Sequence, residues 1–131
     1  MGPSTRDRLL ELRRKMGFRS VEQLLQALVD GYPGGAKALY LARHDAVDRV
    51  LRKHKVKRVT AFGSRARGDH RPDSDLDLVG RLPASADLVT LAHVQEELTE
   101  AFGVPVHFVS EGGVKPRLRQ QIERDGVLLA P

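Results

Sequence analysis

Two short motifs in the middle of the chain carry residue types that could do chemistry together. Gly63 and Ser64 follow a short apolar run, and Asp75 and Asp77 come after an intervening stretch of ten residues. A strand that runs into Gly-Ser and then a helical turn exposes backbone N–H groups, and such a helix start attracts phosphate. Gly63 lets a ligand approach the backbone closely, and Ser64 offers a hydroxyl for a phosphate oxygen or for capping the turn.

The carboxylates and arginines around this turn complete a predicted Mg-nucleotide site. Asp75 and Asp77 are one residue apart, so on a strand they share one face with Cα atoms about 6.5 Å apart. Carboxylates this close are costly unless a cation lies between them, and Mg²⁺ favours a few carboxylates plus phosphates. Arg65 and Arg67 add positive charge nearby. Singly, each motif is also typical of an ordinary helix cap or a solvated strand edge, but their conjunction favours function.

The elements that would position these residues predict an α/β fold with a small mixed sheet and helices packed on one side. Leu and Val at helical spacing predict helices at 36–54 and 87–102, and a shorter one at about 115–123. Strands are predicted at 59–62, at 74–80 with both aspartates, and at 104–109. Residues 127–129 either form a further strand or pack against the domain.

Residues 1–34 predict a helical extension before a domain at 35–131. Ser4 and Thr5 can cap a helix at 6–15, and Ser20 can cap a second helix whose buried face carries Leu24, Leu25, Leu28 and Val29. The Gly-rich stretch at 31–35 is the strongest break in the chain. Two helices around 16–20 could form a DNA-binding motif, but a hairpin that packs on the domain or on a partner is favoured.

Charge and composition narrow the partners. The net charge of +5 and the pI of about 10.0 favour nucleotide, nucleic acid or an acidic protein, although ordinary solubility explains them equally well. Lys53, Lys55, Lys57 and Arg58 either contact phosphates or form a solvated helix end. The absence of Cys excludes disulfides and thiolate chemistry. The N-terminus lacks the long apolar run of a signal peptide or membrane span, so we expect a soluble cytoplasmic protein.

The string GSRARGDHRPDSDLDL at 63–78 resembles the minimal nucleotidyltransferase (MNT) family of the DNA polymerase β superfamily. That family includes the antitoxins of HEPN–MNT toxin–antitoxin pairs. The resemblance covers about 44–129 and implies a polymerase-β-like nucleotidyltransferase fold. It implies that Ser64 holds the triphosphate of ATP, that Asp75 and Asp77 bind Mg²⁺, and that Arg67 anchors the phosphates or the loop. The implied activity is transfer of AMP to a tyrosine hydroxyl of a HEPN-domain ribonuclease toxin.

One position departs from the family pattern. The family usually carries a third carboxylate on the next strand, where this chain has His107. A neutral imidazole could accept the proton of the attacking hydroxyl and suits Mn²⁺, but it lacks the negative charge that Mg²⁺ favours. Three alternatives follow: an enzyme with His107 as catalytic base, a weakened enzyme, or a nucleotide sensor that neutralises its toxin by binding alone. A DNA-binding regulator acting through residues 1–34 is a further alternative.

Overall fold

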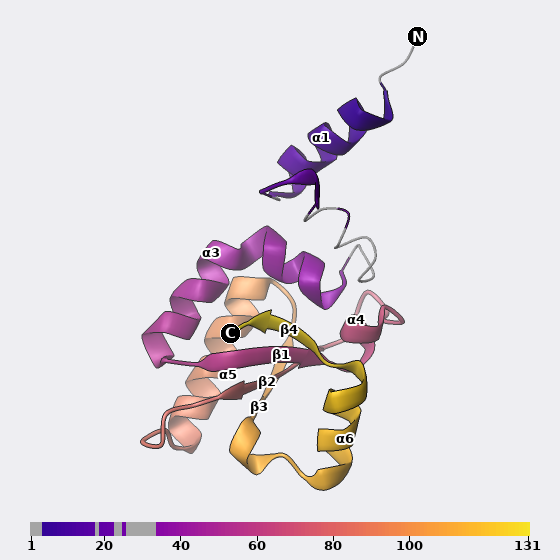
Figure 1. The fold of residues 1–131 in the computed structure, drawn as a ribbon. Coiled ribbons are helices and arrows are strands. Elements are labelled where there is room, and N and C mark those ends of the chain that lie inside the picture. Colours follow the sequence, from indigo (N-terminus) through magenta and orange to yellow (C-terminus); the bar gives the residue numbers. More distant parts are fainter. Residues whose placement is uncertain (1–3, 18, 23–24, 26–33) are drawn as a thin grey trace.

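The computed structural model describes residues 4–17, 19–22, 25 and 34–131, and it confirms the predicted α/β class. Figure 1 shows a sheet with helices against it and α1 standing apart from these layers. The helices are α1 (Thr5–Met16), α3 (Ala36–His54), α4 (Ser64–Arg67), α5 (Leu88–Phe102) and α6 (Pro116–Asp125). The strands are β1 (Lys57–Phe62), β2 (Leu76–Arg81), β3 (Val106–Ser110) and β4 (Val127–Ala130), and a 3₁₀ turn, η1 (Glu111–Gly113), precedes α6.

The sheet is mixed, with strand order β3-β2-β1-β4. β1 is antiparallel to both of its neighbours, while β2 and β3 are parallel. A parallel pair needs a crossover connection, and α5 supplies it. Residues 127–129, for which the sequence left open either a strand or simple packing against the domain, form a strand, since β4 pairs with β1.

The core lies between one face of the sheet and the helices α3 and α5. Alternate strand residues point to opposite faces, and those directed at the two helices are apolar and buried: Val59, Ala61, Leu76, Leu78, Val106 and Phe108. The helices contribute Val47, Leu51, Val94, Leu98 and Phe102. The same alternation places Thr60, Asp77, Val79 and His107 on the opposite face, which we call the open face. The predicted chemistry therefore lies on the side of the sheet away from the core.

Two strands begin later than predicted, for local reasons. β2 starts at Leu76 rather than at residue 74, since the N–H of Ser74 donates to the carbonyl of Arg71 in a turn. Asp75 therefore lies directly before the strand instead of within it. β3 starts at Val106 rather than at residue 104, because Pro105 has no N–H for the ladder. The Pro105 carbonyl still accepts a hydrogen bond of 2.8 Å from the N–H of Leu76.

The N-terminal region is described only in part. The predicted cap of α1 is present: the N–H of Asp7 donates to Ser4 Oγ at 3.1 Å, and the Asp7 carboxylate closes the capping box. Leu24, Leu28, Val29 and residues 31–33 lie outside the described residues, so the second helix and the division at 34/35 stay predictions. Within the described ranges, no helix is both long and apolar enough to cross a bilayer.

Replacing Gly80 with alanine should test the packing of the sheet. A Cβ at this position would lie 2.9 Å from Phe108 Cζ and 3.0 Å from Val56 Cγ1, both inside the core. We expect Gly80→Ala to lower the free energy of unfolding by about 1–3 kcal/mol, the usual cost of overpacking. Urea denaturation should show no comparable loss for Gly112→Ala, where no atom lies within 4 Å of the added carbon.

Candidate nucleotide-binding site

The Asp77 carboxylate lies directly against the backbone of Gly63. Phe62 pairs with Asp77 across the β1–β2 hairpin, so the residue that ends β1 meets the second aspartate. Gly63 has φ +76°, and a Cβ there would collide with the Asp77 carboxylate. Glycine is therefore required at residue 63 for both its conformation and its contact.

The helix α4 directly follows Gly63; it begins at Ser64 and ends at Arg67. Ser64 is partly buried, and its carbonyl accepts hydrogen bonds from the N–H groups of Gly68 and Asp69. Arg67 Nε lies 3.1 Å from Asp69 Oδ2, and its Nη1 lies 3.7 Å from Asp125 Oδ2. Arg67 is thus held beside the turn by carboxylates on two sides, and its charge also acts on Asp77.

Arg65 has different surroundings from those predicted. It is 3% exposed, and its guanidinium donates to the carbonyls of Ser74, Gly34 and Pro72. Burial lowers the pKa of Arg65, and the negative charge of Asp75 opposes that shift. The predicted role in phosphate binding does not fit this burial. The side chain instead supports the loop that leads to Asp75.

Asp75 and Asp77 form the acidic part of the site. Asp75 is exposed, whereas the Asp77 side chain is only 27% exposed. Burial raises the pKa of Asp77 above its ordinary value of 3.8, and the charge of Asp75 adds to the rise. Interactions with His107 and Arg67 act in the opposite direction. The two carboxylates are thus close enough to repel each other.

His107 stands beside Asp77 on the open face. The parallel register of β2 and β3 pairs the two residues, and His107 Nδ1 lies 3.5 Å from Asp77 Oδ1. The imidazole is 59% exposed, so a ligand over the carboxylates can reach it from solvent. The structure therefore brings the predicted base and the predicted metal ligand into contact.

The donor set suits a hard divalent cation that arrives with a nucleotide. Within the described part of the chain, no three His, Asp or Glu side chains form a ready metal cluster. Mg²⁺ is commonly held by one or two carboxylates together with substrate phosphates. Asp75 and Asp77 supply two carboxylates, and a cation bound between them would relieve the repulsion by which Asp75 adds to the raised pKa of Asp77. These two residues fit Mg²⁺, whereas a nitrogen ligand from His107 suits Mn²⁺ better.

The sequence analysis missed Asp125, and it left two alternatives open for the basic residues at 53–58. Asp125 ends α6 and reaches Arg67 from a distant part of the chain, so local spacing gave no signal for it. Lys53 pairs with Glu97 of α5 at 2.5 Å, and Lys55 caps α3 in a left-handed conformation. These contacts match the solvated helix end rather than a nucleic-acid surface, and binding of nucleic acid through them stays a prediction.

Comparison with known proteins places the chain in a family. The model of the nucleotidyltransferase domain family matches residues 45–129, and the chain belongs to that family. A protein of Methanocaldococcus jannaschii, named a putative protein adenylyltransferase, is 32% identical over 60% of this chain and 84% of its own length. A solved structure described as a putative minimal nucleotidyltransferase is 42% identical, with a TM-score of 0.57 over 66% of this chain and 88% of that one.

The fold also occurs in a toxin–antitoxin complex. A chain from the complex of tri-AMPylated Shewanella oneidensis HEPN toxin with MNT antitoxin has a TM-score of 0.52. Its sequence is 20% identical, and the match covers 66% of this chain and 68% of that chain. At this identity the likeness concerns the fold alone. Together the comparisons identify a nucleotidyltransferase of the minimal, polymerase-β-like type.

Shortening Arg65 should weaken the loop before Asp75. Lysine has a single nitrogen and cannot reach three carbonyls, so Arg65→Lys leaves partly buried acceptors without their hydrogen bonds. We expect a loss of about 1–3 kcal/mol in the free energy of unfolding. Arg67→Lys, in the same turn but exposed, should leave the melting temperature nearly unchanged; equal losses for both variants would show that Arg65 has no special supporting role.

The raised pKa of Asp77 predicts that its charge destabilises the fold when no cation is bound. A carboxyl group whose pKa is higher in the folded than in the unfolded protein stabilises the fold while it is protonated. This stabilisation is complete below the unfolded-state pKa and is lost as pH rises through the folded-state pKa. With EDTA present, Asp77→Asn should therefore have a higher free energy of unfolding than wild type at neutral pH. The gain should shrink as pH falls toward about 4. Asp73→Asn, which removes an exposed charge nearby, should show neither effect.

Proposed function

We propose that this protein transfers AMP from ATP to a hydroxyl group of a protein partner, and that it acts as an antitoxin toward a HEPN-type toxin. The observation that carries the proposal is the contact of Gly63 with the Asp77 carboxylate, with α4 starting beside it. This arrangement brings a phosphate-binding turn and a carboxylate pair together. The relative named as a protein adenylyltransferase supports a protein acceptor, and the toxin–antitoxin complex of the same fold supports the partner.

The residues have distinct roles in the proposed reaction. Ser64 and the backbone at the start of α4 hold the triphosphate, with Gly63 allowing its approach and Arg67 adding charge. Asp75 and Asp77 hold Mg²⁺ or Mn²⁺, which when bound neutralises charge on the phosphates. The acceptor oxygen bonds to the α-phosphorus, the bond from that phosphorus to the β-phosphate oxygen breaks, and pyrophosphate leaves. The proton of the acceptor hydroxyl passes to the imidazole of His107.

His107 also supports a second candidate, in which the protein binds nucleotide and masks its toxin without transfer. The imidazole brings no negative charge to the metal, and its Nδ1 already faces Asp77. In this candidate the site senses ATP, and neutralisation of the toxin depends on contact alone. Protection of cells would then survive loss of the carboxylates, whereas protection by transfer would not. The further alternative, a DNA-binding regulator that acts through residues 1–34, is supported by no contact among the described residues.

Transfer should be measured with ATP labelled at the α-phosphate, added with Mg²⁺ or Mn²⁺ to a host lysate. Wild type should label a protein band, and Asp77→Asn should reduce the rate by about 100-fold or more, since metal-held phosphate charge is worth several kcal/mol. Loss of His107 as base, in His107→Ala, should cost about 100-fold or more. Glu96→Gln, an exposed carboxylate on α5 outside the site, serves as the matched control and should keep full activity.

The variant His107→Asp separates the two candidates. It restores the third carboxylate and should raise the rate with Mg²⁺ relative to Mn²⁺ if the site is a weakened transferase. Label with His107→Asp and none with wild type would favour the masking candidate. No label with any variant in a lysate that contains the co-expressed toxin, while wild type still binds ATP and protects cells from that toxin, would rule out transfer as the means of protection.

A further inference from the structure

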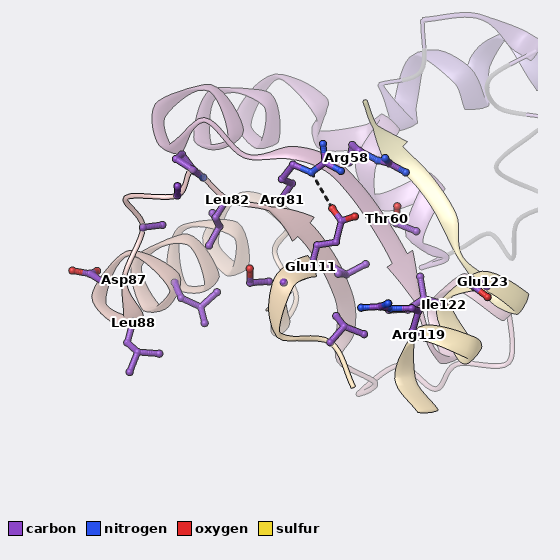
Figure 2. A pocket seen from close by; sticks show the side chains of 18 residues that line it. Arg58, Thr60, Arg81, Leu82, Asp87, Leu88, Glu111, Arg119, Ile122 and Glu123 are labelled. Atoms are coloured by element: carbon purple, nitrogen blue, oxygen red, sulfur yellow. Dashed lines mark hydrogen bonds and ion pairs between the residues drawn. The ribbon is translucent and has the colours of Figure 1, made fainter. Parts of the chain in front are cut away.

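A groove of about 1040 Å³ lies beside the candidate site on the same side of the sheet. Thr60 and Val79, which pair across β1 and β2, form its floor. Figure 2 shows its walls, with the start of α5 on one side and α6 with Arg119 and Ile122 on the other. Val79 is two residues beyond Asp77 on the same face of β2, which is about 6.5 Å along the strand. The groove therefore begins where the carboxylate site ends.

The lining suits the side chains of a polypeptide better than a nucleobase. Its walls include the aliphatic residues Leu82, Leu91 and Ile122, and Leu88 lies at one mouth with 82% of its surface exposed. None of the described residues that line the groove is aromatic, so it offers a base no aromatic stacking surface. Its volume is slightly above the range of about 300–1,000 Å³ seen for small-molecule pockets. An apolar segment of chain would fill it.

The charges of the lining favour the same occupant. Arg81 pairs with Glu111 at 3.3 Å, and Asp87 caps α5 by accepting a hydrogen bond from the N–H of Thr90. Among the described residues, Arg58, Arg119 and Glu123 also line the groove and form no ion pair. The three carboxylates of the lining balance its three arginines, so the described lining has no excess positive charge for a phosphate chain or a nucleic-acid strand. The two arginines without an ion pair suit a single acidic side chain.

Arg58 is held toward the groove by a strained backbone. Its φ is +54°, in the left-handed region that non-glycine residues seldom adopt, and the ladder register shifts between Lys57 and Thr60. Its N–H donates to the carbonyl of Pro131 at 3.2 Å, which fixes the conformation. Bulges of this kind re-aim side chains, and such strain persists chiefly at functional positions. Here the bulge directs a cation to the rim of the groove.

We propose that this groove is the docking site for the acceptor polypeptide, namely an apolar segment that carries at least one acidic side chain. The segment lies across Thr60 and Val79, its acidic group meets Arg58 and Arg119, and its hydroxyl-bearing residue reaches the carboxylates at Asp77. This assignment rests on the proposed function, since it names the surface that selects the acceptor for the same reaction.

A displayed library of twelve-residue peptides with a central tyrosine tests the proposal without requiring catalysis. The full chain with Mg²⁺ and a non-hydrolysable ATP analogue is used for selection. We expect the enriched peptides to combine apolar residues with Asp or Glu. They should bind Leu88→Glu at least about tenfold more weakly than wild type, which is about 1.4 kcal/mol, since a charge placed on an apolar contact is costly. Leu128→Glu is the matched control, because Leu128 is 53% exposed and lies outside the groove.

Reversing a charge gives a second, independent readout. Selection on Arg119→Glu should shift the enriched peptides from acidic toward Lys- and Arg-containing sequences. Failure to enrich any peptide, or equal binding to Leu88→Glu and Leu128→Glu, would overturn the proposal. A tenfold loss of affinity for the ATP analogue in Leu88→Glu would overturn it in favour of a nucleoside in the groove. Peptides that bind as expected but are never labelled with ATP would instead retain the groove assignment and reject AMP transfer.

Discussion

The contact between the Asp77 carboxylate and the backbone of Gly63 is the constraint on which the rest of the site depends. The antiparallel register of β1 and β2 sets it, since Phe62 lies opposite Asp77. A slip of one residue would turn Asp77 toward the core and Leu78 toward solvent. The alternation that fills the core with apolar side chains therefore also fixes the carboxylate against the turn. Fold and site are specified by the same pairing.

Around this contact the chain keeps groups that stability alone would not select. Asp77 is partly buried next to another carboxylate, and Arg58 adopts a left-handed backbone. Such violations of local preference concentrate at functional sites and are offset elsewhere in the fold. Here the offset comes from the packed layer between the sheet and the helices α3 and α5. Arg65 contributes as well, since its buried guanidinium ties Gly34 to the loop before Asp75.

The sequence predicted the parts of this structure that depend on neighbours along the chain. Helical spacing of Leu and Val located α3 and α5, and the Gly63-Ser64 turn located the end of β1 and the start of α4. The burial of Arg65 was missed, because charge and position suggested a ligand, while its acceptor carbonyls lie in the loop at Pro72 and Ser74 and, far away in sequence, at Gly34. Asp125 and the groove were missed for the same reason: each joins elements far apart in sequence. Local patterns do not specify such tertiary contacts.

The position of β4 has a consequence for how the chain folds during synthesis. β1 is an inner strand, yet one of its partners is Val127–Ala130, made about 70 residues later. Until then β1 presents an unpaired edge, and the part of the core that Leu129 fills is exposed. Exposed strand edges recruit other chains, and non-local pairing slows folding. The nascent domain thus passes through a stage vulnerable to aggregation that lasts until β4 adds to the sheet.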